Sequence, residues 1–408
     1  MPWPWSRFLI TKPPPVAERA EHSARQRPEP VDRRFRSTSL LALGWLHFLN
    51  DGAANYLPGI LPAVLIGLKL DVSLAGTVMT ALVFGQALQP ATGWLADRFG
   101  GRRFLAIGLL GTSLGAALLP LLPQAFLLWP VLLIMGCTNA VFHPQAMAGA
   151  RSVSGSRQGL GMSIYLVGGE IGRGIWPLLA SLVVVWFGIK WIWLLTLPAL
   201  FSVPLLWRVL PIQPQRQRSG IAIDWRRHLF PVSILLCFCF LRALAIFGLT
   251  TFLPVYWHEQ GASLVAGAAT ITVMLIVGVL GNVGGGHLAD RIGRRPVLVY
   301  SSLMAFVLLL AFLWAPNELR WVLLGLIGMA LFASLPLGVI IAQDMFPENP
   351  SFGAGVALGF CNGAAALALS GLGVVAHYSG TRAVLYCLVA ALLLATLLAR
   401  VMPVGRIT

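Results

Sequence analysis

The sequence predicts an all-α membrane protein with twelve transmembrane helices arranged as two pseudosymmetric six-helix bundles. Composition is the first reason: 57% of the 408 residues are hydrophobic and only 11% are charged, whereas soluble proteins carry roughly 25% charged residues. A mean hydropathy of +0.81 agrees with this. The second reason is a series of long apolar stretches, and the third is a loop sequence that occurs twice at matched positions.

The apolar stretches have the length of membrane-spanning helices. The stretch from Phe104 to Leu122, for example, contains no charged residue. About 20 residues, rising 1.5 Å each, cross a ~30 Å hydrocarbon core. A strand of a membrane β-barrel would instead alternate apolar and polar residues over about ten positions. Because only helices and closed barrels satisfy their backbone hydrogen bonds in lipid, the pattern favours helices.

Twelve such stretches are predicted, and because twelve is even, both chain ends should lie on one side of the membrane. They cover residues 39–65, 74–96, 104–122, 125–147, 159–184, 190–210, 229–256, 264–288, 297–315, 320–343, 352–376 and 382–402. The longest polar segment after the N-terminal tail separates the sixth stretch from the seventh. We therefore expect a disordered cytoplasmic tail, an N-terminal bundle, a cytoplasmic central loop, a C-terminal bundle and a cytoplasmic C-terminus, at residues 1–38, 39–210, 211–228, 229–402 and 403–408.

The positions of the Lys and Arg residues predict the orientation. If the N-terminus is cytoplasmic, 23 of the 29 Lys and Arg residues fall on the cytoplasmic side and four on the opposite side. The remaining two, Arg173 and Arg242, lie inside helices. Because Lys and Arg accumulate in cytoplasmic loops, we predict a multi-pass protein of the inner (plasma) membrane with both termini in the cytoplasm. This placement explains the net charge of +15 without a nucleic-acid partner.

Neither a cofactor nor a metal ion is predicted. The five cysteines all fall inside apolar stretches, with an odd number and irregular spacing, so we expect small packing residues and no disulfide framework or metal site. No GxxxxGKS or GxxxxGKT motif is present, so direct drive by ATP is not supported. No histidine pair with metal-ligand spacing and no nucleophile motif occurs either, which argues against an enzyme.

The repeated loop is the most specific local motif. The segment GWLADRFGGRR runs from Gly93 to Arg103 after the second stretch, and GHLADRIGRR runs from Gly286 to Arg295 after the eighth. Glycine permits a tight turn between antiparallel helices, and the aspartate and arginines can form charged pairs at the membrane surface. A repeated half around a central loop is typical of a pseudosymmetric transporter. The predicted conformational latch comprises Gly93, Asp97, Arg98, Arg102, Arg103, Gly286, Asp290, Arg291, Arg294 and Arg295.

Polar side chains at membrane depth are the candidates for substrate or proton handling, because each ionisable group there costs at least about 2.5–3.5 kcal/mol. His47, Asn50 and Asp51 share one face of the first helix at i, i+3 and i+4. Glu170 and Arg173, spaced i and i+3, can pair in the fifth. The other candidates are Gln86, Gln89, His143, Arg242 and Asn362.

Several of these residues have a structural alternative. Glu170 and Arg173 can be an ion pair that only holds the fifth helix to a neighbour. His143 can instead cap the helical turn that Pro144 interrupts. Gln86 and Gln89 can have the purely structural role of bridging helices by hydrogen bonds. Asp51 has the weakest structural explanation, so it is the preferred proton or substrate carrier.

The repeated loop resembles the signature of the major facilitator superfamily, which implies the fold of that family. In that family the aspartate corresponding to Asp97 braces the two halves in one access state, together with Arg98, Arg102 and Arg103. The segments HFLNDGAANYLPGILP, QALQPATGWLADR, NAVFHPQAMAGAR and GGEIGRGIWPLL resemble the fosmidomycin-resistance group of this superfamily. That resemblance implies proton-driven export of a small, often anionic or amphiphilic compound. Glu170 departs from the pattern, where an uncharged amide is commoner.

The sequence therefore leads to a hypothesis of a monomeric, proton-coupled antiporter that exports a small organic molecule by alternating access. Protonation of Asp51 or Glu170 would weaken its pairing with Arg173, His47 or Arg242, so that substrate and proton compete for one cluster. Two arginines at depth favour an anionic substrate, although they can instead neutralise Glu170 and Asp51. The alternatives are a proton symporter that takes up a metabolite and a non-transporting membrane sensor or scaffold.

Overall fold

The computed structural model describes residues 36–89, 91–92, 101–154, 158–209, 225–346 and 356–402. Across these ranges the chain is helical and contains no β-strand. Residues 1–35 of the predicted tail, residues 211–224 of the predicted central loop and residues 403–408 lie outside the described residues.

The N-terminal helices lie among the described residues between 36 and 209. Leu119–Leu121 (η1), Ala125–Leu127 (η2) and Ile189–Thr196 (η3) are 3₁₀ turns. The α-helices are α2 (Ser37–Asn55), α3 (Leu57–Gly67), α4 (Ser73–Gln86), α6 (Arg102–Leu118), α7 (Leu128–Val153), α8 (Gln158–Phe187) and α9 (Leu197–Val209).

Residues 225–346 and 356–402 form the C-terminal helices. A short π-helix, η4 (Val356–Phe360), leads directly into α16. The α-helices are α10 (Trp225–Glu259), α11 (Leu264–Ile292), α12 (Arg294–Phe312), α13 (Asn317–Ala333), α14 (Leu335–Met345), α16 (Cys361–Ser379) and α17 (Thr381–Arg400).

The predicted all-α membrane fold is confirmed. Within the described residues, each of the twelve predicted stretches coincides with one helix or with consecutive helices. Eight helical spans are long and apolar enough to cross a membrane, and Ser73–Gln86 and Ile189–Pro204 are shorter apolar helices. The first stretch is divided between α2 and α3 at Tyr56, next to Pro58, which has no N–H to continue the hydrogen-bond ladder.

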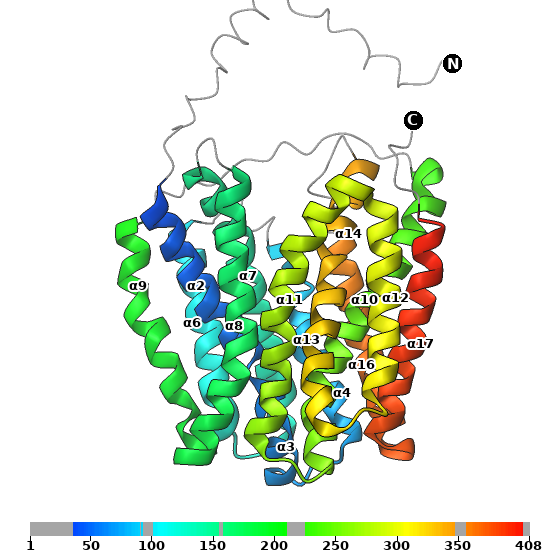
Figure 1. The fold of residues 1–408 in the computed structure, drawn as a ribbon. Helices are drawn as coiled ribbons and strands as arrows, with labels where there is room; N and C mark the ends of the chain where they lie inside the picture. The colour runs from blue at the N-terminus through cyan, green and yellow to red at the C-terminus, as the bar shows by residue number, and fades with distance from the viewer. Residues whose placement is uncertain are drawn as a thin grey trace, which may run out of the picture.

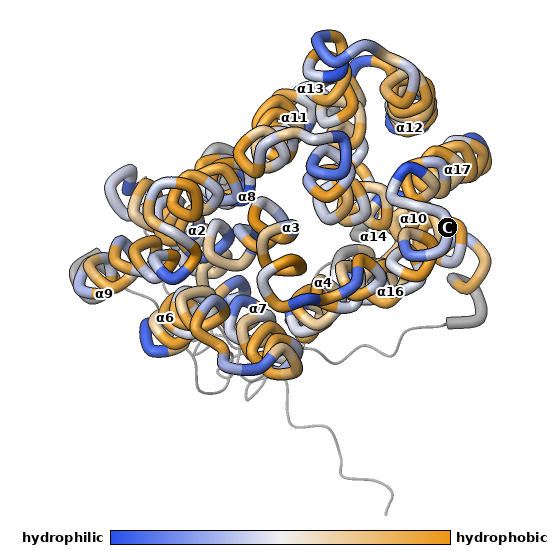
Figure 2. Tube along the Cα trace, turned by 90° about the horizontal axis from the view of Figure 1, so that it is seen from below, coloured by the Kyte–Doolittle hydropathy of each residue, from blue (hydrophilic) through white to orange (hydrophobic). Residues whose placement is uncertain are grey.

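The helices form two bundles that stand side by side, α2–α9 in one and α10–α17 in the other (Figures 1 and 2). We call the end at which α2 begins and α17 ends the upper face, and the end at which α3 ends the lower face, as oriented in Figure 1.

Helix packing repeats from one bundle to the other. In the first bundle α2 packs on α8 and α4 on α7, and in the second bundle the corresponding helices pair as α10 with α16 and α11 with α13. The most extensive contacts between the bundles are those of α4 with α16 and of α8 with α11, and α3 also contacts α10 and α11. The first two pairs exchange places when the halves are exchanged, as a pseudo-two-fold relationship requires.

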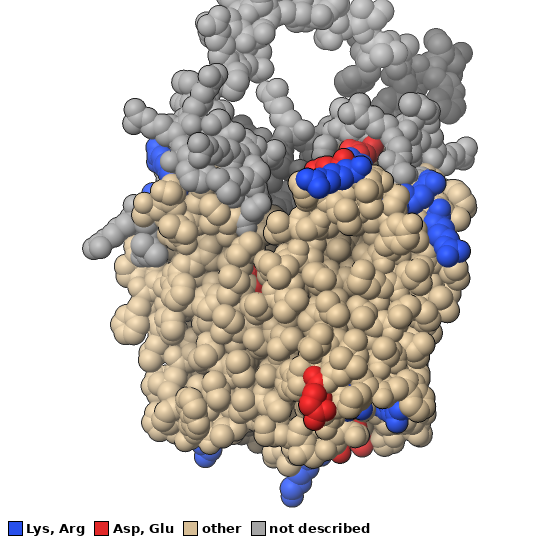
Figure 3. All heavy atoms as spheres, viewed as in Figure 1, with Lys and Arg blue, Asp and Glu red and all other residues tan. Residues whose placement is uncertain are grey.

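The outer surface suits a lipid environment. Figure 3 shows a wide middle band with almost no charged atoms, whereas charged side chains gather toward the upper and lower faces. Large apolar side chains point outward from this band, among them Phe201 at 78% and Leu280 at 66% exposure. Exposed aromatic residues such as Trp186, Trp314 and Tyr378 suit the membrane–water interface.

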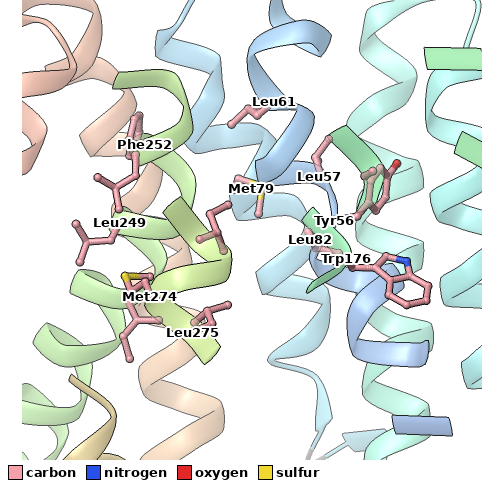
Figure 4. Close-up of a cluster of buried hydrophobic side chains, with 14 of the residues drawn as sticks. Tyr56, Leu57, Leu61, Met79, Leu82, Trp176, Leu249, Phe252, Met274 and Leu275 are labelled. Atoms are coloured by element: carbon pink, nitrogen blue, oxygen red, sulfur yellow. The ribbon is translucent and has the colours of Figure 1, made fainter. Parts of the chain in front are cut away.

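Apolar side chains from both bundles meet between the helices that join them. Figure 4 shows Met79 and Leu82 of α4 together with Tyr56 and Leu57, facing the side where Leu249, Phe252, Met274 and Leu275 of α10 and α11 lie. All of these residues belong to one continuous cluster of buried hydrophobic side chains. Burial of this kind is non-directional, so this contact can be made and broken without unpaired polar groups.

Candidate functional site

Asp51 lies at the centre of a buried polar cluster inside the N-terminal bundle. His47, one turn earlier on α2, has Nε2 3.3 Å from Asp51 Oδ2. His143 of α7 has Nε2 3.1 Å from Asp51 Oδ1. The spacing on one helix predicted that His47 and Asp51 share a face, and the structure adds His143 from a different helix.

Two backbone carbonyl groups orient the imidazole rings. His47 Nδ1 lies 2.8 Å from the carbonyl oxygen of Tyr165, and His143 Nδ1 lies 2.9 Å from that of Asn139. A carbonyl oxygen only accepts hydrogen bonds, so each Nδ1 must carry the hydrogen. Both Nε2 atoms, 3.3 Å apart, therefore direct lone pairs at each other and at Asp51 unless a positive charge is bound. This arrangement of lone pairs can bind protons or another cation.

Two asparagines complete the surroundings of the carboxylate. Asn50 Nδ2 donates to Asp51 Oδ1 at 3.3 Å, and Asn139 Nδ2 reaches the same oxygen at 3.4 Å. Asn50 was a sequence candidate, whereas Asn139 was missed. Its spacing of four residues before His143, on the same helix face, is the signal that could have found it.

Glycines of α8 bring this helix against α2. A Cβ atom at Gly168 or at Gly172 would each lie 2.2 Å from a backbone carbonyl oxygen of α2, so the two backbones touch, as small residues permit in membrane bundles. This approach stacks the Tyr165 ring on His47, with ring centroids 4.1 Å apart and an interplanar angle of 11°. The glycine-rich sequence of α8 therefore positions the cluster.

A second polar group, Glu170 and Arg173, lies at the interface of the two bundles. Arg173 Nη1 donates to Glu170 Oε1 at 3.3 Å, which is the pairing that the i, i+3 spacing predicted. Glu170 Oε2 is buried and has no hydrogen-bond partner among the described residues. Arg173 lines a cavity between the bundles together with Asn55, Pro58, Met79, Val83, Phe247, Thr250, Thr251, Ile271, Leu275 and Leu369.

The cavity and the Asp51 cluster are adjacent. Asn55, which lines the cavity, donates from Nδ2 to the backbone carbonyl of Asp51 at 2.8 Å. One helical turn of α2 thus separates the buried carboxylate from the space between the bundles. A change of charge at Asp51 therefore alters the electrostatic potential close to the cavity.

Arg242 is a buried cation from the C-terminal bundle. It is 4% exposed, and its Nε and Nη1 atoms have no hydrogen-bond partner among the described residues. It lies within electrostatic range of Glu170 and Arg173, although these residues belong to the opposite bundle. The structure therefore brings together one carboxylate and two arginines across the interface.

Three predicted site residues lie apart from these groups. Gln86 ends α4 and is half-buried, one turn beyond the cavity-lining Val83. Gln89 and Asn362 are also half-buried, and none of the three lines the cavity. The polar side chains that α10 contributes to the lining, Thr250 and Thr251, were missed because threonine is common in membrane helices and carries no charge.

The first copy of the repeated loop is described only at its end. Gly93, Asp97 and Arg98 lie outside the described residues. Arg102 and Arg103 begin α6, with Arg102 half-buried and Arg103 exposed.

The second copy lies at the upper face and pairs within its own bundle. Arg294 forms an ion pair with Asp344, near the end of α14. Arg295 donates from Nε and Nη2 to the carbonyl oxygen of Met402, at 3.1 and 2.8 Å. Of the remaining members, Gly286 lies on α11 with open space around it, and Asp290 and Arg291 are exposed near its end.

At the lower face a side-chain hydrogen bond joins the two bundles. Asp71 follows α3, and its Oδ1 lies 2.7 Å from Nδ1 of His377 on α16. The backbone N–H of Ser73 also donates to Asp71 Oδ1 at 2.8 Å. This hydrogen bond, followed by the contact with His377, holds the pKa of the Asp71 carboxyl below its usual value. Neither residue was a candidate from the sequence, because both lie next to loops and outside the long apolar stretches' centres.

Comparisons with known proteins agree with this architecture. The family model described as Major Facilitator Superfamily matches residues 43–369. An uncharacterized MFS-type transporter, YfnC, of Bacillus subtilis (strain 168) is 28% identical over 360 residues, covering 84% of this chain and 87% of the relative. The fosmidomycin resistance protein of Escherichia coli (strain K12) is 27% identical over 378 residues, covering 87% and 92%.

Solved structures show the same fold. A bacterial homolog of the human lysosomal transporter Spinster, in an inward-facing and occupied conformation, superposes with a TM-score of 0.75 at 15% identity, covering 90% of this chain and 97% of that one. A variant of the nucleoside transporter NupG superposes with a TM-score of 0.73 at 16% identity, covering 90% and 99%.

Proposed function

We propose that this chain, which belongs to the major facilitator superfamily of membrane transporters, is a proton-coupled antiporter that exports a small organic compound by alternating access. Membership makes it a multi-pass membrane transporter and not an enzyme. The observation that carries the proposal is the charged group at the interface of the bundles, where Glu170 pairs with Arg173 at 3.3 Å and Arg173 lines a small cavity. Substrate and proton sites at one interface are what alternating access requires.

Coupling arises from the carboxylates. When Glu170 or Asp51 takes up a proton from the outside, its attraction for the neighbouring arginine or histidine falls. Substrate and proton compete for this one group of side chains, so that only one of them is bound in each half of the cycle. The proton must therefore be released to the cytoplasm before the next substrate molecule binds. Competition of this kind links the two movements in opposite directions.

Support for an anionic substrate comes from the arginines. Arg173 reaches the cavity and Arg242 lies within electrostatic range of it with two unpartnered nitrogen atoms. Guanidinium groups suit carboxylates and phosphonates because they donate in a planar fork. The name of the Escherichia coli relative, fosmidomycin resistance protein, points to the same chemical class.

For the orientation, we propose that the upper face is cytoplasmic and that the protein lies in the inner membrane. The helix ends that flank the segments with the excess of Lys and Arg residues lie at this face, and such segments accumulate on the cytoplasmic side. A monomer is sufficient for the proposed cycle, since the two bundles of one chain already enclose the cavity.

The test is a proton-flux measurement in liposomes that contain the purified protein and a pH-sensitive dye. Gradients of small anionic compounds, fosmidomycin among them, are imposed, and we expect proton movement in the opposite direction for at least one compound. Asp51→Asn and Glu170→Gln identify the carrier, because the neutral amide abolishes proton movement only where the carboxylate carries the proton. Asn362→Ala, away from the cavity, is the control.

Three outcomes would contradict parts of the proposal. Proton movement in the same direction as the compound would indicate a symporter. Transport by both amide variants with unchanged proton dependence would remove Asp51 and Glu170 from the coupling. Folded protein that moves no proton with any compound would exclude proton coupling for the anions tested.

A further inference from the structure

The cluster around Asp51 has the dimensions of a metal site, which goes beyond the proposed transport function. The three ligand atoms are His47 Nε2, His143 Nε2 and the Asp51 carboxylate, and they all lie within 4.8 Å of one another. The two Nε2 atoms are 3.3 Å apart, and they lie 3.3 and 3.1 Å from the carboxylate oxygens. Zinc–nitrogen bonds of about 2.0–2.1 Å in a tetrahedron place neighbouring ligands roughly 3.3 Å apart. The two Nε2 atoms have this spacing, and each lies at a similar distance from one of the two carboxylate oxygens, so the three side chains are close enough to share one zinc ion.

The orientation of both rings also suits metal binding. Metal-ligating histidines usually donate their second ring N–H to a carbonyl or carboxylate, which fixes the tautomer and points the other nitrogen at the metal. His47 and His143 both do so, toward the carbonyl oxygens of Tyr165 and Asn139. Stacking on Tyr165 further holds the plane of the His47 ring. The two imidazole rings are therefore held in place by neighbouring groups with their Nε2 atoms directed toward the carboxylate.

An independent observation points to a ligand next to the carboxylate. Asn50 is 0% exposed, and its Oδ1 atom has no hydrogen-bond partner among the described residues, although buried polar atoms almost always have one. Its Nδ2 atom is 3.3 Å from Asp51 Oδ1. A water molecule in the fourth position of a three-ligand site would supply the missing donor for Asn50 Oδ1.

We propose that His47, Asp51 and His143 bind one divalent transition-metal ion, with zinc as the best match to the ligand types and distances. The sequence gives no sign of this site, because the ligands come from α2 and α7 and no single segment shows their spacing. A bound metal ion uses the lone pairs of the same three side chains that would otherwise bind protons. On the premise of the proposed function, zinc therefore inhibits transport by occupying the cluster.

Binding is measured on the full-length protein in detergent, purified with a tag that contains no histidine and treated with chelator. Isothermal titration with zinc is expected to show one site per chain, which His143→Gln removes. The control is His287→Gln, which changes an exposed histidine on α11. Cobalt, titrated in the same way, should give the visible absorption of a tetrahedral complex. Absence of a stoichiometric zinc site in the wild type, or equal binding by His143→Gln, would overturn the proposal.

A measurement on the wild type does not depend on the folding of any variant. Diethyl pyrocarbonate modifies accessible histidine nitrogens, and mass spectrometry locates the modified residues. His143, with 14% of its side chain exposed, is expected to be protected by zinc, while His287 is modified equally with and without the ion. Equal modification of His143 under both conditions would refute the site.

The test also separates this proposal from the transport proposal, since binding requires no substrate. A protein that binds zinc at His143 but moves no protons keeps the metal site and loses the proposed function. A protein that exchanges protons for substrate and binds no zinc does the reverse.

Discussion

Gly76 of α4 and Leu369 of α16 are in direct backbone contact across the two bundles. A Cβ atom at position 76 would lie 1.9 Å from the Leu369 carbonyl oxygen. Thr80, one turn later on α4, donates to the carbonyl oxygen of Ala366 and lies 2.9 Å from Ser370 Oγ. The helices therefore need glycine at this point to close the lower part of the interface.

Gly76→Ala should weaken this closure. The added methyl group cannot fit without moving α4 or α16, and overpacking of this kind costs about 1–3 kcal/mol. We expect a lower unfolding temperature in detergent and a lower rate of substrate exchange in liposomes. Gly371→Ala is the matched control, because no atom lies within 4 Å of a Cβ atom there. Equal effects of the two changes would show that the close contact is not the cause.

Asp71→Asn should favour opening of the lower face. The change removes the charge that faces His377 at 2.7 Å. Because hydrogen bonding lowers the pKa of Asp71, the carboxylate is ionised at every pH above its usual range of about 4, and its charge is lost as the pH falls through the lowered pKa. Spin labels are placed on the loop after α3 and at the end of α16, and the distance between them is measured by electron paramagnetic resonance. This distance should be longer in the variant.

In the wild type, the Asp71 carboxylate should stay ionised between about pH 5 and pH 8. Ser152→Ala, a change of an exposed residue near the end of α7, controls for nonspecific effects. Unchanged label distances in Asp71→Asn would mean that the contact between Asp71 and His377 does not contribute to closure.

The pair of Glu170 and Arg173 can be tested with a double-mutant cycle. Removing one partner of a buried pair typically costs about 3–5 kcal/mol, since the other charge stays buried and unpaired. We therefore expect Glu170→Gln to lower the free energy of unfolding, and Glu170→Gln with Arg173→Gln to recover most of it. If the pair also works in transport, proton-coupled flux stays lost in the stable double variant. Full flux in that variant would assign the pair a purely structural role.

Arg242→Met should separate stability from binding. The side chain is buried with two unpartnered nitrogen atoms, so an apolar residue of similar length should leave stability unchanged or raise it. Affinity for anionic compounds should fall about tenfold or more, which corresponds to about 1.4 kcal/mol. Competition binding on the purified protein measures this, with Lys190→Met at an exposed position as control. Unchanged affinity would place Arg242 outside the binding site.

The ion pair of Arg294 and Asp344 should contribute little on its own. The side chains are 34% and 36% exposed, and pairs of this kind are worth about 1 kcal/mol or less. Arg294→Asp should lower the free energy of unfolding by about that amount, and adding Asp344→Arg should restore it. Asp290→Asn, at an exposed site without an ion pair to the described residues, is the comparison. No recovery in the swapped variant would show that the pair is not stabilising.

Much of the candidate site was predictable because intramembrane charge is rare. His47 and Asp51, and likewise Glu170 and Arg173, were predicted to be neighbours from helical spacing alone, and both contacts are present. The contact between His143 and Asp51 was not predictable in this way. It depends on how α7 lies against α2, which is decided by packing between helices and leaves no pattern in either segment.

The repeated loop illustrates the same limit. Two matched copies of the motif predicted the two halves, yet the partner of Arg294 is Asp344 on α14, which the motif does not contain. Asp344 is recognisable in the sequence as a single acidic residue at the end of an apolar stretch. The sequence does not show which of several arginines pairs with it.

The sequence by itself determined the helical membrane fold, the division into two halves and the residues that carry charge into the membrane. Length, apolar composition and the cost of burying charge in lipid are local properties, and they can be read from each segment separately. Only the tertiary structure decided which of those residues meet, at the Asp51 cluster, at the cavity beside Arg173 and at the pair of Asp71 with His377. These contacts depend on backbone approach at glycines such as Gly76 and Gly168, and so on distances between segments far apart in the chain.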